Sequence, residues 1–239
     1  MKPNAFLSVY RGKFALAAAV SVIAGCGSLP QARMALPDSM QGATPYVIEG
    51  VSGKASGQIQ VASSAGTFSR SATRLSLFDL AVRDRAAAPF DISGRDWQGT
   101  LSANCSLREV RVEGMALSIP VLPLKYACDF SAGGDAQGRL VLAQAMGRVA
   151  QPTPRREGEV AYLGTVLRIR AEYGLAGSPF KLGRPSGYRF ERDGMTVAAV
   201  EVTDTSRPTF LVANGLSERE RQTALLGALA LGLVWEPDQ

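Results

Sequence analysis

The chain has 239 residues, a hydrophobic fraction of 46% and a formal net charge of +5, and it contains no histidine. This length favours one domain, and the composition is that of an ordinary globular protein. The absence of histidine excludes Ser-His-Asp and Cys-His catalysis, histidine general bases and histidine metal ligands. We therefore expect no metal and no cofactor, and an enzyme of this sequence would have to use carboxylates or a Ser-Lys pair.

Residues 1–25 have the pattern of a secretory signal. Lys2, Arg11 and Lys13 carry positive charge without an acid, and an apolar run of about ten residues follows. That run is shorter than the roughly 20 residues that a helix needs to cross a bilayer. The segment leads into Ile23-Ala24-Gly25-Cys26, which resembles the lipobox of bacterial lipoproteins: an aliphatic residue, two small residues and a cysteine.

The lipobox resemblance implies that residues 1–25 are removed as a signal peptide and that Cys26 becomes an acylated N-terminus. Three acyl chains would hold the protein firmly, since each buried CH₂ contributes about 0.8 kcal/mol and stable anchoring needs more than one chain. In lipoproteins of this kind, an aspartate directly after the acylated cysteine disfavours sorting to the outer membrane. Residue 27 is glycine, which implies an outer-membrane location with the domain in the periplasm. The alternative is that Cys26 belongs to a plain signal peptide or an uncleaved anchor.

Removal of the leader takes away three basic residues and no acid. The 23 basic residues that remain against 21 acids leave a charge of only +2. No cluster of Lys and Arg with interleaved aromatic residues occurs, so we expect no nucleic-acid partner. The expected partners are the membrane, through the lipid on Cys26, and an envelope protein or a lipid.

Residues 26–45 are predicted to form a flexible tether, because Pro30, Pro37 and Pro45 stand there among small and polar residues. A short arm packed on the domain is the alternative. Residues 46–239 are predicted to form a single β-rich domain.

Alternating apolar and polar residues predict two hairpins. The first spans residues 122–145, around a Gly-Gly-Asp turn. The second spans residues 188–202, where Asp193-Gly194 suits a type I′ turn and would place Phe190 opposite Val197.

Two further segments are predicted to be single strands. Residues 75–85 fit either a helix or a buried strand, and we favour the strand. Residues 163–173 alternate well, with Leu163 on the apolar face and Arg168 on the charged face.

Cys105 and Cys128 share strand parity with neighbouring apolar residues, so both thiols are expected on an apolar face. An even pair of cysteines in an oxidising compartment usually forms a disulfide. The enclosed loop of 24 residues suggests about 3 kcal/mol of stabilisation. Two buried free thiols are the alternative.

The C-terminal segment is predicted to be a helix over about residues 218–235. Ser217 and Glu220 have the spacing of a capping box. Residues 223–235 are apolar on every side and would span about 20 Å, too short to cross a bilayer. Such a helix must be enclosed by protein. The predicted fold is therefore mainly β (α+β), an antiparallel sheet or barrel enclosing this helix, with a β-sandwich and a packed helix as the alternative.

The strand at 167–173, the Asp193-Gly194 hairpin and the C-terminal helix together resemble the tubby-like and LURP-one-like fold. The resemblance covers residues 163–235 and implies antiparallel strands closed around a hydrophobic helix. The basic residues that hold phosphoinositide headgroups in tubby domains cannot be placed on this sequence, so no ligand site is carried over from the resemblance.

Two groups of charged residues were weighed as sites. A set of arginines could form a basic outer face for anionic headgroups or glycans, although neighbouring acids favour an ordinary solvated face. The arginines are Arg155, Arg156, Arg168, Arg170, Arg184, Arg189 and Arg192. The candidate catalytic carboxylates are Asp79, Asp84, Asp91 and Asp96. Acids in turns and on surfaces are commoner than catalytic acids, so no catalytic residue is predicted.

The sequence thus predicts a lipoprotein of the bacterial outer membrane that is not an enzyme and has a structural or partner-binding role. The alternatives are a protein that binds a lipid or another apolar ligand and a histidine-free carboxylate hydrolase.

Overall fold

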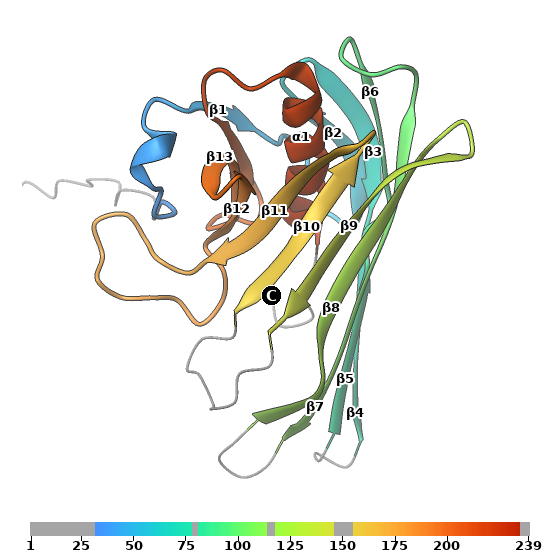
Figure 1. Cartoon of the computed structure of the whole chain (residues 1–239). Coiled ribbons are helices and arrows are strands. Elements are labelled where there is room, and N and C mark those ends of the chain that lie inside the picture. The colour runs from blue at the N-terminus through green and yellow to red at the C-terminus, as the bar shows by residue number, and fades with distance from the viewer. Residues whose placement is uncertain (1–31, 78–80, 114–117, 146–154, 235–239) are drawn as a thin grey trace, which may run out of the picture. The chain divides into compact units, whose positions relative to one another are not determined.

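The computed structural model describes residues 32–77, 81–113, 118–145 and 155–234 (Figure 1). Cys26 and the leader lie outside these residues, and Ala32–Gln239 forms one unit. Its elements are η1 (Asp38–Met40), β1 (Thr44–Val47), β2 (Ser56–Val61), β3 (Ser64–Ser69), β4 (Ser71–Leu77), β5 (Ala81–Ala87), β6 (Phe90–Gly94), β7 (Leu101–Glu113), β8 (Ser118–Ala132), β9 (Asp135–Gln144), β10 (Arg156–Tyr162), β11 (Thr165–Glu172), β12 (Gly187–Arg192), β13 (Met195–Glu201), β14 (Thr209–Val212) and α1 (Glu218–Leu233).

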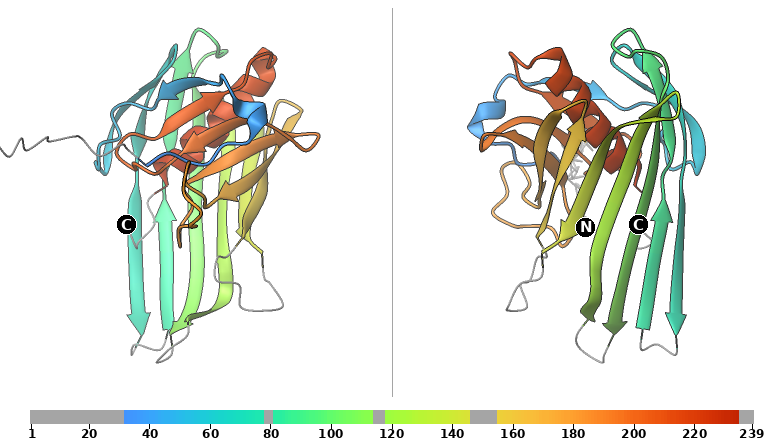
Figure 2. Two further views of the ribbon diagram at one scale, coloured as in Figure 1. Left: turned by 90° about the vertical axis from the view of Figure 1, so that its left-hand side faces the viewer. Right: turned by 45° about the vertical axis from the view of Figure 1, so that its right-hand side comes forward.

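The strands belong to one antiparallel sheet that curls into a nearly closed barrel (Figures 1 and 2). Its order is β1-β14-β13-β12-β11-β10-β9-β8-β7-β6-β3-β2, while β5 lies off this path and pairs with β4 and β7. The two ends of the path meet where Glu49 and Gln60 exchange backbone hydrogen bonds of 2.9 and 3.2 Å. One continuous sheet of this kind confirms the predicted mainly β fold and differs from the sandwich that was its alternative.

The helix α1 lies inside the barrel, against strands β10 to β14 (Figures 1 and 2). Every residue of α1 from position 223 to position 233 is buried. The helix can be apolar on all sides because the sheet surrounds it, and this confirms the predicted enclosure. Tyr126 of β8 donates its hydroxyl to the carbonyl oxygen of Ala230 at 2.7 Å, in the last turn of α1. Burial raises the pKa of Tyr126, so this buried phenol stays a hydrogen-bond donor.

The predicted capping box is present at the start of α1. The Glu220 amide donates to the Ser217 hydroxyl oxygen at 3.3 Å, and the Ser217 amide donates to the Glu220 carboxylate at 2.9 Å. Arg192 of β12 also forms an ion pair with Glu220. These partners satisfy amides at the helix N-terminus and tie that terminus to the sheet.

Acid should loosen this cap. The hydroxyl and the amide of Ser217, together with Arg192, hold the pKa of Glu220 below its ordinary value against the opposite effect of burial. A depressed folded-state pKa contributes stability that is present above the unfolded pKa and is lost as the pH falls through the folded one. The free energy of unfolding should therefore fall below about pH 4.5 in the wild type, and less steeply in Glu220→Gln. Denaturant titrations from pH 6 to pH 3 measure this slope.

Glu218→Gln, at an exposed position of the same turn, is the control and should keep the wild-type slope. Equal slopes in wild type and Glu220→Gln would contradict the prediction.

A sheet of long strands continues beyond the barrel at the lower end of Figure 1. Strands β3 and β4 on one side, and β5 and β6 on the other, form one long hairpin in a single register from Ser64↔Gly94 to Leu77↔Ala81. We call the outer part of this sheet, which consists of β4, β5, residues 106–112 of β7 and residues 121–125 of β8, the projecting sheet. The prediction of one strand over residues 75–85 was wrong, because β4 ends at Leu77 and β5 begins at Ala81.

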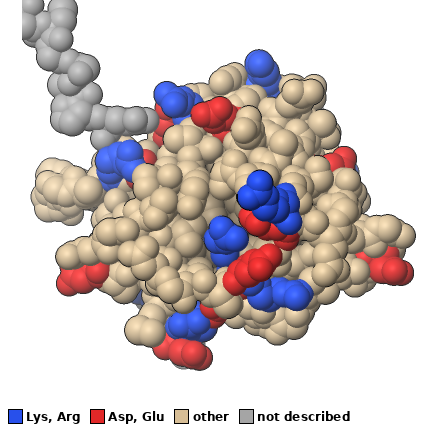
Figure 3. All heavy atoms as spheres, turned by 90° about the horizontal axis from the view of Figure 1, so that it is seen from above, with Lys and Arg blue, Asp and Glu red and all other residues tan. Residues whose placement is uncertain are grey.

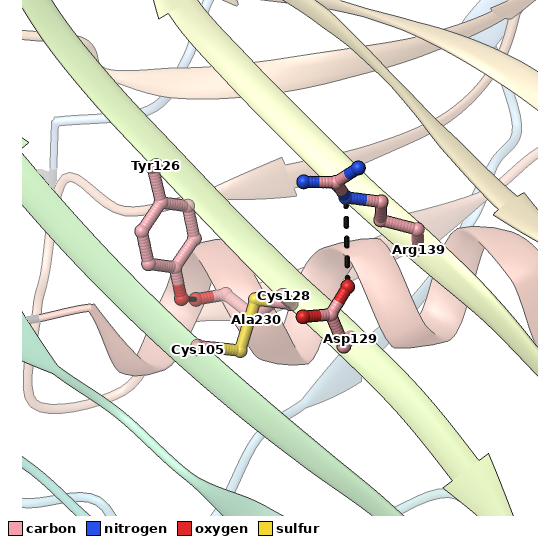
Figure 4. The surroundings of a disulfide bond; sticks show 6 residues. All are labelled: Cys105, Tyr126, Cys128, Asp129, Arg139 and Ala230. Carbon is pink, nitrogen blue, oxygen red and sulfur yellow. Dashed lines mark hydrogen bonds and ion pairs between the residues drawn. A yellow bond between two sulfur atoms is a disulfide. The ribbon is translucent and has the colours of Figure 1, made fainter. Parts of the chain in front are cut away.

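The predicted disulfide is confirmed. Cys105 of β7 and Cys128 of β8 lie directly opposite each other, are bonded, and are 0% exposed (Figure 4). Asp129, the next residue of β8, points away from this buried side and pairs with Arg139 at 3.5 Å (Figure 4). The alternation along β8 therefore places the disulfide on the inner, buried face of the sheet.

Both predicted hairpins form, but with two local differences. Asp193 and Gly194 have φ angles of 51° and 81°, as a type I′ turn requires. A bulge between Phe190 and the next residue of β12 then places Phe190 opposite Ala198 and leaves Val197 as the extra residue of β13. The expected pairing with Val197 was therefore wrong by one residue. Leu163, expected on the apolar face of a strand, lies in the turn before β11 and is 45% exposed.

The segment before β1 is packed rather than free. Met34 and Met40 are each 2% exposed and cover Ala199 and Leu211 on the outside of β13 and β14. The amide of Met34 donates to the buried carboxylate of Glu201 at 2.9 Å. The tether predicted over residues 26–45 was therefore wrong for this part of it, and the packed-arm alternative holds. The two methionine side chains bury apolar surface, and the hydrogen bonds to Glu201 and Gly174 add to their hold on the sheet.

Candidate functional site

The four acids weighed as catalytic groups do not come together. Asp79 lies outside the described residues. Asp84 is buried on the inner face of β5, whereas Asp91 of β6 is exposed. Asp96 lies in the loop after β6, at the other end of this long hairpin. Carboxylates of a glycosidase pair must stand about 5–10 Å apart across one cleft, and these three acids share none.

Asp84 belongs instead to a charge cluster on the inner face of the projecting sheet. Arg74 donates to its two carboxylate oxygens at 2.9 and 3.0 Å, and Arg111 donates to it at 2.7 Å. Glu109 lies 3.9 Å from Arg111. Asp84 is 2% exposed, and a buried carboxylate is tolerated because cations neutralise it. These ion pairs link β4, β5 and β7, so the role of the cluster is structural.

Beside α1, the hollow that the described residues line is small. A hollow at the C-terminal end of α1, lined by Tyr188, Leu231 and Val234 among others, has a volume of about 20 Å³. That volume is enough for about one water molecule. Pockets for small-molecule ligands usually measure about 300–1,000 Å³.

Larger hollows lie on the outside of the sheet. One of about 560 Å³ crosses β3, β6 and β7 and is lined mainly by small polar side chains such as Thr67, Ser69 and Asn104. Within it, the Ser102 hydroxyl donates to the Asp91 carboxylate. The base beside Ser102 is the exposed Asp91 carboxylate. No Lys or Arg lines this hollow to complete an activated serine nucleophile.

The outer face of the projecting sheet carries a row of unneutralised cations, which we call the basic row. Arg85 of β5 lies directly opposite Arg108 of β7, and Arg108 lies directly opposite Lys125 of β8. Arg83 stands two residues from Arg85 on the same face, and all four side chains are exposed. Among the described residues, none of these four cations has an ion pair or a hydrogen bond to its side chain.

Exposed apolar side chains lie beside Arg83 and between it and the far end of the same sheet. They are Leu75 of β4, Val112 of β7, and Val121 and Leu122 of β8, with exposed fractions of 55%, 40%, 60% and 53%. We call these four residues the apolar tip. Isolated exposed apolar residues are ordinary on a protein surface, whereas several at one end of a sheet make that end a candidate interaction surface.

The arginines that were weighed as a basic outer face are mostly neutralised. The pairs are Arg168–Glu157 at 2.9 Å, Arg170–Glu191 at 3.1 Å, Arg189–Glu172 at 3.6 Å and Arg192–Glu220. Seen from above, basic and acidic side chains lie close to one another on the surface (Figure 3). The interpretation of an ordinary solvated face therefore holds for these four arginines.

The basic row was missed by sequence reasoning because its members come from three strands. Arg83 and Arg85 do alternate with buried residues along β5, and that alternation was a signal that both side chains point outward. No local pattern, however, shows that Arg108 and Lys125 lie beside them, since this depends on the pairing of β5, β7 and β8.

No protein-family model, no curated protein and no solved structure matches this chain. Within the ranges that the structure describes, no three Cys, Asp or Glu residues come together in a way that could hold a metal ion. In the same ranges, no helix is long and apolar enough to span a membrane.

Proposed function

We propose that this protein is a lipoprotein of the bacterial outer membrane, anchored through a lipid on Cys26, and that its domain acts in the periplasm by binding rather than by catalysis. The observation that carries the proposal is that α1 occupies the inside of the barrel. A domain filled by its own helix presents its outer surface to other molecules. The projecting sheet, with its basic row and apolar tip, is the part of that surface best suited to binding.

The two alternatives have less support among the described residues. A protein that binds an apolar ligand inside its barrel needs a cavity, and the space beside the end of α1 holds about one water. A carboxylate hydrolase needs two converging acids. Asp84 is clamped by arginines on the inner face, whereas Asp91 is exposed on the outer hollow.

Substitution of Cys26 tests the anchoring. In Cys26→Ser, labelling by radioactive palmitate should be lost, and the protein should move from the membrane fraction to the soluble fraction. The fractions are washed at high salt first, so that proteins held only by charge are removed. Ser28→Ala alters a neighbouring residue and keeps the cysteine, so its labelling should match the wild type. Undiminished labelling of Cys26→Ser would contradict the proposed anchor.

A further inference from the structure

We propose that the outer face of the projecting sheet binds the surface of an anionic lipid bilayer. The apolar tip would lie at the boundary between headgroups and acyl chains, and the basic row would lie at the phosphates. This goes beyond anchoring, because a lipid on Cys26 attaches the protein without any membrane contact by the domain itself.

The first argument is electrostatic. Arg85, Arg108 and Lys125 stand directly opposite one another on neighbouring strands, and like charges in such positions repel. On the inner face of the same sheet, by contrast, Arg74 and Arg111 are neutralised by the buried carboxylate of Asp84, to which they donate at 2.9 and 2.7 Å. The uncompensated charge on the outer face is complementary to an anionic surface, and a layer of lipid phosphates would relieve the repulsion among all of these cations at once.

The second argument is the order of the side chains along the strands. Leu75 of β4 lies opposite Arg83 of β5, and Arg83 lies opposite Val110 of β7. This level of the sheet is two residues further out than the level of Arg85 and Arg108. Val112 follows two residues further out. Two residues of a strand span about 7 Å. The apolar side chains therefore begin at the level of Arg83 and about 7 Å beyond the other three cations of the basic row. This offset matches the roughly 5–10 Å by which interfacial segments enter the headgroup boundary.

The backbone limits how deeply the sheet can enter. Among the described strands, β4 pairs with β5 alone, so its other edge has backbone groups without partners in these strands. Such groups are costly in hydrocarbon, where no water can satisfy them. The inferred contact is therefore shallow, with side chains in the boundary region and the edge of β4 within reach of water.

A probe on the apolar tip tests the contact directly. Val121→Cys in the full chain is labelled with an environment-sensitive fluorophore and mixed with phosphatidylcholine vesicles that contain or lack 30% phosphatidylglycerol. We expect a blue shift and protection from an aqueous quencher with the anionic vesicles alone, and loss of both in 0.5 M salt. Val166→Cys, 54% exposed in β11 near the opposite end of the barrel, is the matched control and should show neither. The unsubstituted chain, labelled identically, corrects for any reaction at Cys26.

Charge reversal tests the basic row. Arg85→Glu combined with Arg108→Glu should weaken anionic-vesicle binding of the Val121 probe by more than about tenfold. Arg168→Glu is the matched control, because Arg168 is exposed on the outer side of β11 and paired with Glu157; it should leave binding unchanged. The probe reports contact at the tip, so its result is separate from that of the palmitate experiment. No shift with anionic vesicles, or an equal shift with neutral ones, would overturn the proposal. A shift that grows with protein concentration without vesicles would also overturn it, since a second copy would then cover the tip.

Discussion

Truncation of Phe190 to alanine is expected to lower the free energy of unfolding by about 3–5 kcal/mol. Phe190 is 0% exposed in β12, and its ring lies against Gly227 of α1. A Cβ atom at position 227 would stand 2.4 Å from the ring, so the glycine is what allows the helix to lie this close to the sheet. Removal of the ring would leave a cavity at this contact. Because the total stability of a domain is about 5–15 kcal/mol, the loss would be a large part of it.

Chemical denaturation of wild type and variant measures this loss, and Phe180→Ala is the matched control. Phe180 is 78% exposed, so its truncation should change stability by less than about 0.5 kcal/mol. Gly227→Ala adds a second check. In the wild-type background, the methyl group added by Gly227→Ala should clash with Phe190 and destabilise the protein. This is expected even though alanine is more favourable than glycine in a helix by about 1 kcal/mol. In the Phe190→Ala background the methyl group has room, so the same change should stabilise. Additive effects of the two substitutions would show that the ring and the helix are not in tight contact.

Removal of the disulfide is expected to cost about 3 kcal/mol. Cys105 and Cys128 are 23 residues apart in sequence, and a cross-link of that length restricts the unfolded chain by about this amount. Cys105→Ala combined with Cys128→Ala should therefore unfold at a lower denaturant concentration. Both residues are 0% exposed, so a reductant should reach the bond in the wild type only when the barrel opens.

The double variant separates the bond from the packing around it. Wild type unfolded and refolded in reductant keeps both side chains but lacks the bond, so its stability should match that of the double variant within about 1 kcal/mol. Rapid reduction of the folded protein, at a rate independent of added denaturant, would contradict the inferred protection inside the barrel.

The features that sequence reasoning predicted correctly have local causes. The cap of α1 needs only Ser217 and Glu220, three residues apart, and the type I′ turn needs only Asp193 and Gly194. The disulfide followed from the alternation of side chains along two strands. The enclosure of α1 followed from its apolar residues, since a helix without a polar side must be buried on every side.

The features that were missed depend on contacts between distant segments. The bulge at Phe190 shifts the pairing with β13 by one residue, and the repeating pattern of the sequence contains no sign of it. The packing of Met34 and Met40 on Ala199 and Leu211 joins segments more than 150 residues apart. Their sequence surroundings, rich in proline and polar residues, favour a free tether.

The sequence by itself determined the two hairpins, the Asp193-Gly194 turn, the capped apolar helix and the disulfide pair of this protein. Those features depend on residues a few positions apart or on simple alternation along a strand. Only the tertiary structure decided the order in which the strands curl around α1 and the alignment of Arg85, Arg108 and Lys125 in one row. Neighbouring strands place their side chains according to their register, and the register is set by packing across the whole sheet. The surface through which we expect the domain to bind is therefore a product of the fold.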